Sequence, residues 1–158
     1  MKPRTNDQHP GYRALMELLR AADTIWNASR LFFERWDLSP SQFNVLNLLR
    51  LNRRGLSQSD LSRQLIMHRS NITGLVDRLE KRRLVARREV RADRRAYRVV
   101  LTRGGAVLLR RILPLYYREA AQAWGRLPRK RAADLIAELQ KVARNAQRVA
   151  AKLPRRKS

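Results

Sequence analysis

The sequence of 158 residues contains no cysteine and two histidines, His9 and His68. Without a thiol there is no disulfide framework, no thiolate metal site and no redox sensing through cysteine. Neither histidine has a second imidazole or a carboxylate at metal-ligand spacing, so we expect no metal and no cofactor. No paired carboxylates, glycine-rich phosphate loop or Ser/His/Asp arrangement emerges, and an enzyme is not expected.

Long apolar runs and acidic residues are also scarce. No stretch of about 18 uncharged apolar residues occurs, and residues 1–10 lack the apolar core of a signal peptide, so we expect a soluble, cytoplasmic protein. There are 13 Asp and Glu residues against 36 Lys and Arg, a net charge of +23. Such an excess predicts a polyanionic partner, either nucleic acid or an anionic membrane surface. The hydrophobic fraction of 44% is enough for a folded core, and the length suits one domain.

The first half of the chain has the period of amphipathic helices. Apolar residues recur every three or four positions from Tyr12 to Trp36, and Ser39-Pro40 then begins a second helix. A capping-box variant, Ser57 with Asp60, opens a short helix from Gln58 to Leu65. With the next helix, Arg69 to Arg82, it forms a helix-turn-helix candidate.

After Arg83 the apolar period changes from 3.6 to 2. Two strands are predicted, Leu84 to Val90 and Tyr97 to Leu101, separated by a basic turn from Arg91 to Ala96. From Lys81 to Arg98 nine residues are basic and two are acidic, a local charge of +7. This hairpin is predicted to bind phosphates, since the arginine fork matches phosphate oxygens, although such a run is also compatible with a merely solvated face.

Two helices are expected after the hairpin. Thr102 can cap one that runs to about Trp124 and is bent or broken near Pro114. The last helix has apolar residues at alternating steps of four and three, which is the seam of a helix that packs along another helix: Leu135, Leu139, Val142, Ala146, Val149 and Leu153. Because the seam is rich in alanine and valine, helix packing accounts for it more simply than a membrane surface.

The helix from Arg69 to Arg82 has polar residues in its first turns, of the types that read base edges in the major groove. They are His68, Arg69, Ser70, Asn71 and Thr73. Ser70 and Asn71 could instead only cap the helix, and His68 could be structural.

Seven short motifs in order resemble the MarR family of bacterial transcriptional regulators. They are Leu38 to Leu46, Leu56 to Leu61, Asn71-Ile72-Thr73, Val76 to Glu80, Leu84-Val85, Asp93-Arg94-Arg95 and Leu101 to Gly105. The resemblance implies a mainly α fold with a small β-hairpin wing, a winged helix-turn-helix whose N- and C-terminal helices form a homodimer. The corresponding parts of this chain are residues 1–37, an N-terminal arm and dimerisation helix; 38–102, the DNA-binding lobe; and 103–158, C-terminal dimerisation helices and a basic tail.

The resemblance also implies roles for particular residues. Thr73 and Arg78 fall on recognition-helix contacts, Arg87 on a backbone contact at the wing base, and Arg95 at the wing tip beside Asp93, which orients it. With the polar residues at the start of the helix and the basic residues of the hairpin, the expected DNA-binding set is Arg69, Ser70, Asn71, Thr73, Arg78, Arg87, Arg94 and Arg95. Two positions depart from the family: Gly74 stands where several members place an arginine that contacts DNA, and Arg83 replaces a glycine before the wing.

Many members of this family are released from DNA by small aromatic or phenolic ligands. The lining residues expected here are Trp26, Phe33, Trp36, Tyr116 and Tyr117, although aromatic residues at helical spacing also serve as core or dimer contacts. The expected function is a regulator, most simply a repressor, that binds a pseudo-palindromic operator as a homodimer. The alternative is an architectural protein that binds DNA largely without regard to sequence, as the charge of +23 would allow.

Overall fold

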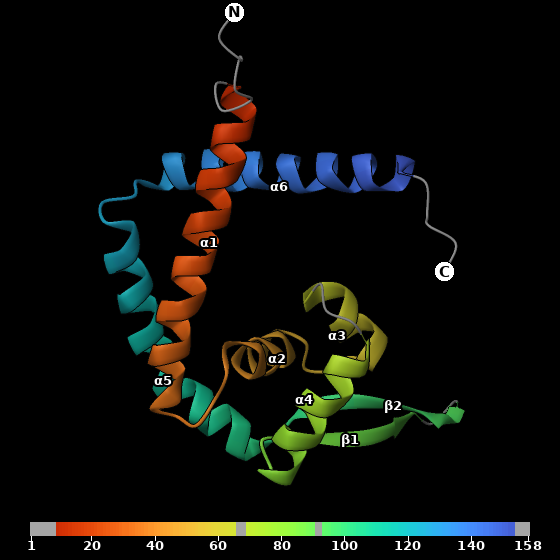
Figure 1. Ribbon diagram of the computed structural model, residues 1–158. Coiled ribbons are helices and arrows are strands. Elements are labelled where there is room, and N and C mark those ends of the chain that lie inside the picture. The colour runs from red at the N-terminus through yellow and green to blue at the C-terminus, as the bar shows by residue number, and fades with distance from the viewer. Residues whose placement is uncertain (1–8, 66–68, 91–92, 154–158) are drawn as a thin grey trace, which may run out of the picture. The chain divides into compact units, whose positions relative to one another are not determined.

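The computed structural model describes residues 9–65, 69–90 and 93–153. Its elements, in chain order, are α1 (Pro10–Glu34), α2 (Pro40–Leu51), α3 (Gln58–Leu65), α4 (Arg69–Lys81), β1 (Val85–Val90), β2 (Asp93–Leu101), α5 (Arg103–Trp124) and α6 (Arg129–Lys152) (Figure 1). This order of four helices, a hairpin and two helices confirms the fold predicted from the sequence: mainly α, with a winged helix-turn-helix.

The chain divides into two compact units, Met1–Leu113 and Pro114–Ser158. The boundary falls inside α5 at a proline that the helix continues through. Pro114 has no backbone N–H, so it removes one hydrogen bond from α5 without breaking the helix. The three-part division after residues 37 and 102 stays a prediction.

The core of the first unit lies between α2, α3, α4 and the hairpin. In the first unit, α3 packs on α4, and β1 lies beside α4 (Figure 1). Phe33, at the end of α1, stacks on Phe43 of α2 with ring centroids 4.3 Å apart. Fully buried aliphatic residues complete the core, among them Leu46, Leu61, Ile72, Leu79, Val99 and Leu109.

Side-chain caps begin the helices of the lobe. The Ser39 hydroxyl accepts a hydrogen bond from the backbone N–H of Gln42 at 3.2 Å, while the Gln42 side chain accepts one from the Ser39 N–H at 2.8 Å. This capping box, with Pro40 in the first turn, confirms the predicted start of α2; the part played by Gln42 was not foreseen. At α3 the predicted variant is also present, since Asp60 N–H donates to the Ser57 hydroxyl at 3.1 Å.

The hairpin is antiparallel and longer than predicted. The pairing runs from Val85 opposite Leu101 to Val90 opposite Asp93, with an irregularity between Glu89 and Val90. Strand β2 therefore begins at Asp93 and not at Tyr97, and the predicted six-residue turn is wrong. Asp has low strand propensity, but pairing with β1 outweighs that preference. The two residues between the strands, 91 and 92, lie outside the described part of the chain.

Two helices end in a left-handed residue other than glycine. After α4, Arg83, which replaces the family glycine, has φ of 56°, and the N–H of Leu84 donates to the carbonyl of Leu79 at 3.0 Å. After α1, Asp37 has φ of 51° and the N–H of Leu38 binds the carbonyl of Phe33 in the same way. Both are Schellman-type ends, which satisfy carbonyls that the helix leaves open.

The last two helices differ in how much of them is buried. Thr102 caps α5 as predicted, because its hydroxyl accepts from the Gly105 N–H at 3.0 Å. The first half of α5 buries Leu109, Ile112 and Leu113, whereas α6 has no buried residue along its 24 positions. Within the described residues, no helix is both long and apolar enough to cross a membrane.

Candidate nucleic-acid interface

Helix α4 is amphipathic, with an apolar face and a polar face. Ile72, Leu75, Val76 and Leu79 are buried in the core of the lobe. Because these positions repeat every three or four residues, the opposite face is left to polar side chains. Four of the predicted DNA contacts are exposed there: Ser70, Asn71, Thr73 and Arg78. The Arg69 side chain and His68 lie outside the described residues.

Thr73 is tied to the helix that precedes α4. Its hydroxyl donates to the side-chain carbonyl of Gln58 at 3.2 Å. Gln58 is at the first position of α3 and is only 7% exposed, and its Nε2 is buried with no hydrogen-bond partner among the described residues. The contact fixes α3 against the polar face of α4. Sequence reasoning missed Gln58, because its partner is 15 residues away.

Arg78 occupies the space above Gly74. A Cβ added to Gly74 would lie 3.6 Å from a terminal nitrogen of Arg78, which is ordinary van der Waals contact. The guanidinium therefore lies near the position where other members of the resembled family carry an arginine. One arginine on the next turn brings positive charge to the same part of the helix surface.

Arg87 joins the hairpin to α4. Its guanidinium forms ion pairs with Asp77 and Glu80, its backbone N–H donates to Glu80 at 2.8 Å, and it lies 5.4 Å from the ring centroid of Tyr97. Burial alone would lower the pKa of Arg87, but the hydrogen bonds to Asp77 and Glu80 raise its pKa above the ordinary value. Arg87 was predicted to contact the DNA backbone, and that role stays a prediction. In the structure its ion pairs hold the hairpin against α4.

The tip of the hairpin carries the remaining predicted contacts. Arg94 and Arg95 lie within β2, and Asp93 is its first residue. Their side chains fall outside the described part of the structure. Their roles at the DNA, and the orientation of Arg95 by Asp93, stay predictions.

A second arginine connects α4 with the end of α1. Arg82 donates to the backbone carbonyls of Asp37 and Trp36, the latter at 3.2 Å, and it also lies 3.4 Å from the Asp37 carboxylate. The bonds join two chain segments 45 residues apart and hold the C-terminal end of the recognition helix on the turn between α1 and α2. This residue carried no prediction from the sequence.

The predicted ligand-lining residues have different environments. Phe33 is 1% exposed and packs in the core against Phe43. Trp36 is partly buried, its Nε1 has no partner among the described residues, and the guanidinium of Arg111 lies 5.6 Å from its ring. Trp26 is exposed on α1, and Tyr116 and Tyr117 belong to the second unit.

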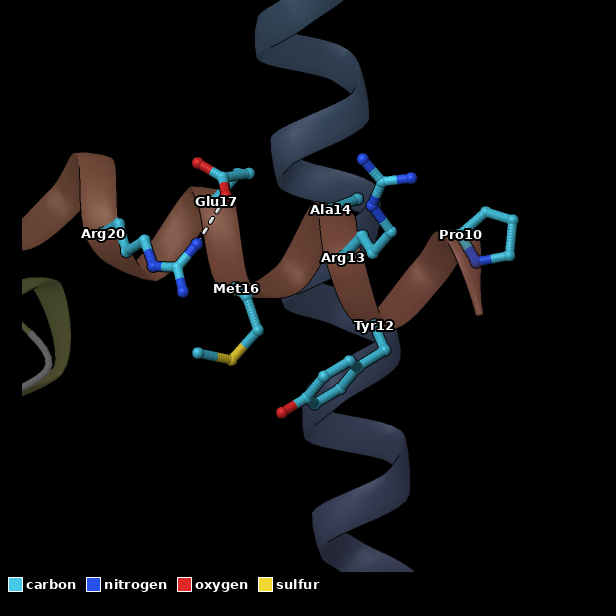
Figure 2. Close-up of a pocket in the computed structure, with 7 residues that line it drawn as sticks. All are labelled: Pro10, Tyr12, Arg13, Ala14, Met16, Glu17 and Arg20. Atoms are coloured by element: carbon cyan, nitrogen blue, oxygen red, sulfur yellow. Dashed lines mark hydrogen bonds and ion pairs between the residues drawn. The ribbon is translucent and has the colours of Figure 1, made fainter. Parts of the chain in front are cut away.

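The N-terminal half of α1 presents an open hollow of about 1010 Å³. Figure 2 shows its lining side chains, among them Tyr12, Met16 and the ion pair between Arg20 and Glu17 at 2.7 Å. All of the lining residues come from one helix, and one helix alone does not enclose a ligand. In the part of the chain that the structure describes, no three His, Cys, Asp or Glu side chains are grouped as a metal site would need.

The cap of α3 gives a first prediction, on stability. Ser57→Ala is expected to lower the free energy of unfolding by about 1 kcal/mol, because it removes the acceptor of the Asp60 N–H. Hydrogen bonds from the Ser57 side chain, and then from Arg63, lower the pKa of Asp60 below 3.8. This stabilisation is complete above pH 3.8 and is lost as the pH falls from there through the folded-state pKa.

Urea unfolding between pH 7 and pH 3 measures both the loss of the cap and the loss of stability in acid. The control is Ser59→Ala, an exposed position in the same helix that makes no cap. Ser57→Ala should lose stability at pH 7 and show a smaller acid-dependent loss than the control. Equal curves for the two variants would contradict the role given to Ser57.

These elements together define a winged helix-turn-helix: α3 and α4 are the helix pair, and β1 and β2 are the wing. The comparisons with known proteins agree. The model of the MarR family matches residues 36–96. Over 115 residues the chain is 31% identical to the HTH-type transcriptional regulator PapX of Escherichia coli, covering 72% of this chain and 70% of that protein.

Two further relatives extend the comparison. Over 72 residues the chain is 39% identical to the transcriptional repressor MprA of Escherichia coli. This match covers 46% of this chain and 41% of MprA. A MarR family transcriptional regulator from Streptomyces coelicolor, solved in complex with DNA, matches with a TM-score of 0.78 and 26% identity, covering 90% of this chain and 92% of the other. The chain belongs to the MarR family of transcriptional regulators.

Proposed function

We propose that the protein binds a pseudo-palindromic DNA operator as a homodimer, in the cytoplasm, and acts as a repressor. The observation that carries the proposal is the exposed polar face of α4, with Asn71, Thr73 and Arg78, beside a hairpin rich in arginine. Asn pairs with adenine and Arg with guanine in the major groove, and Thr suits either a polar base edge or the thymine methyl. The Streptomyces coelicolor relative with DNA and the repressor MprA support this assignment.

The wing supplies the second part of the contact. We assign Arg94 and Arg95 to the minor groove that flanks the operator, where a narrow A·T-rich groove attracts arginine. Arg69 and Ser70, at the start of α4, are assigned to the edge of the major groove and its phosphates. In this assignment Arg87 supports the wing from within and compensates the charges of Asp77 and Glu80 near the DNA backbone.

The homodimer rests on apolar residues that the single chain leaves exposed. On α1 these are Tyr12, Leu15, Leu19 and Trp26, and on α6 they include Ile136, Val142 and Val149. Exposed apolar stripes on long helices are the usual surfaces of helix packing between subunits. Two-fold symmetry then places the half-sites about 10 base pairs apart on one face of the duplex.

A small aromatic or phenolic effector completes the proposal. Trp36 supports it, because its buried Nε1 has no hydrogen-bond partner among the residues that the structure describes, and its ring lies near the cation of Arg111. A phenol oxygen would satisfy this donor. Trp26, Tyr116 and Tyr117 stay candidates for the lining, whereas Phe33 is a core residue that packs on Phe43.

The test is selection of bound sequences from a random duplex pool at near-physiological salt, with the mass of the free protein measured in parallel. Charge alone dominates binding at low salt, so the salt concentration decides whether the selection reports sequence. We expect enrichment of an inverted repeat and the mass of a dimer. A monomer, or tight binding without enrichment, would contradict the proposal.

Binding without enrichment would favour the second candidate, an architectural DNA-binding protein. The observation behind this candidate is the net charge of +23, which is spread over both units. An architectural protein should bind scrambled and selected duplexes equally and show a steep dependence of affinity on salt.

A further inference from the structure

The C-terminal end of α2 carries a group of arginines that the proposed function does not use. A hollow of about 570 Å³ is lined by Arg50, Arg53, Arg54 and Arg98, together with residues of the turn between them. All four arginine side chains are exposed, and the lining contains no acidic residue. We call these four residues the arginine cluster.

The backbone holds the arginine cluster in a defined place. Asn52 ends α2, with its side chain donating to the carbonyl of Leu48 at 2.8 Å. Gly55, at φ of 75°, closes a tight turn by donating its N–H to the carbonyl of Asn52 at 2.8 Å. Leu56 then pairs with Val99 of β2 through hydrogen bonds of 3.0 and 2.8 Å. The turn is therefore fixed to the strand that carries Arg98.

Little space is left for this turn to move against the strand. A Cβ on Gly55 would come within 2.6 Å of the Val99 carbonyl oxygen. Arg98 adds a side-chain bond, since its guanidinium donates to the carbonyl of Gly55 at 3.1 Å. Arg53 and Arg54, inside the turn, are thus presented from a rigid base.

The charges of the arginine cluster are not neutralised within the described residues. Arg50 donates to the amide oxygen of Asn47 and Arg98 to a backbone carbonyl, both neutral acceptors. Arg88 stands directly opposite Arg98 in the strand pairing and adds another cation. Like charges placed opposite one another destabilise a hairpin, and a bound polyanion would remove that repulsion.

The helix dipole explains only part of the cluster. A cation in the last turn of a helix is favourable, which accounts for Arg50. Arg53 and Arg54 lie beyond the end of α2, and Arg98 is on a strand, so none of the three stabilises the helix in this way. Their arrangement fits recognition of phosphate groups, which the guanidinium fork binds bidentately.

Arg98 of the arginine cluster and α4 lie on opposite faces of the hairpin. Arg87 and Tyr97 are on the face toward α4, because Arg87 forms ion pairs with Asp77 and Glu80. Successive side chains of a strand point to opposite faces, so Arg98 points away from α4. A duplex read by α4 is therefore on the other side of the hairpin from Arg98, to which the turn that contains Arg53 and Arg54 is hydrogen-bonded.

We propose that the arginine cluster binds the phosphate backbone of a second DNA duplex, so that the protein on its operator can hold another segment of DNA. This inference rests on the proposed DNA-binding function. It extends that function from binding one operator to holding two DNA segments together. The ligand is recognised by phosphate charge and not by base sequence.

The experiment uses the full-length protein and the duplex found by selection, attached to beads. A first measurement is capture of the protein on operator beads and on scrambled beads, which tests the proposed function. A second measurement is recruitment of a free, labelled 30-base-pair duplex without the operator to beads that carry the captured protein. The test variant is the double substitution Arg53→Ala and Arg54→Ala, and the control with the same charge change is Arg144→Ala and Arg148→Ala on α6.

We expect the wild type and the α6 control to recruit the second duplex, and the Arg53 and Arg54 variant to recruit it at least fivefold less. Affinity of that variant for the operator alone should change less than twofold. The slope of log recruitment against log salt should fall by about 2, since two phosphate contacts are lost.

Other results would overturn the inference. Absence of recruitment by the wild type would do so, as would equal recruitment by the wild type and the Arg53 and Arg54 variant. An equal loss of operator affinity and of recruitment in that variant would assign the cluster to the operator contact instead. Failure of the proposed function is recognised separately, by equal capture on operator and scrambled beads in the first measurement.

Discussion

Gly105→Ala is expected to lower the free energy of unfolding by about 3 kcal/mol, the largest loss we predict for a single methyl group. A Cβ at this position would lie 2.2 Å from the carbonyl oxygen of Leu84 and 2.7 Å from the Leu101 side chain. The first of these atoms is backbone, and it also accepts a hydrogen bond from Thr102. The start of α5 and the base of the hairpin would have to separate.

The neighbouring glycine provides a matched control. A Cβ on Gly104 has its nearest atom, the Arg83 carbonyl oxygen, at 3.3 Å, and the residue is exposed. Gly104→Ala should therefore change stability by less than about 1 kcal/mol, since its mild crowding is offset by the helix propensity of alanine. Urea unfolding at one fixed protein concentration compares the two variants. Equal stabilities would show that the contact between α5 and the hairpin is loose.

The second large effect is expected on DNA binding. Arg87→Ala should weaken affinity for the selected operator by about tenfold to a hundredfold. The substitution removes the cation that pairs with both Asp77 and Glu80 and leaves two carboxylates on α4 beside the DNA phosphates. Removing one member of a partly buried ion pair is costly because its partners keep their charge without compensation. The wing also loses its side-chain bond to the recognition helix.

The control for this prediction is Arg88→Ala, the next residue of β1, which is exposed on the other face of the hairpin. It removes the same charge and should lower operator affinity less than threefold. Arg87→Lys should lie between the two, because lysine keeps the charge and loses the fork. Fluorescence anisotropy with a labelled operator at fixed salt compares the operator affinities of the three variants. If Arg87→Ala and Arg88→Ala bind alike, Arg87 contributes only a unit of charge.

Elements set by local chemistry were predictable from the sequence. The capping box at Ser57, the start of α2 at Ser39 and the cap at Thr102 each depend on residues within three positions of one another. The family pattern also marked Arg83 as a replacement for glycine, and the structure shows that this residue keeps a left-handed conformation. Helical periodicity then placed each helix within a few residues of its true ends.

Elements set by distant partners were not predictable in the same way. The start of β2 at Asp93 depends on pairing with Val90, which overrides poor strand propensity. The ion pairs of Arg87, the Gln58 contact of Thr73 and the Arg82 bonds to the α1–α2 turn join residues that are 7 to 46 positions apart. The resemblance to a family identified the surface that carries the candidate contacts, whereas the packing behind that surface required the structure.

The exposed surface of α6 should make the measured stability of this protein depend on its concentration. Along its 24 residues none is buried within the chain, whereas most helical stability in proteins comes from the packing of an amphipathic face. In the proposed homodimer, part of the folding free energy is then a free energy of association and obeys mass action. The midpoint of thermal unfolding should rise with protein concentration, and near the dissociation constant dilution alone should reduce the helix content. A stability quoted for this regulator therefore has meaning only with the concentration at which it was measured.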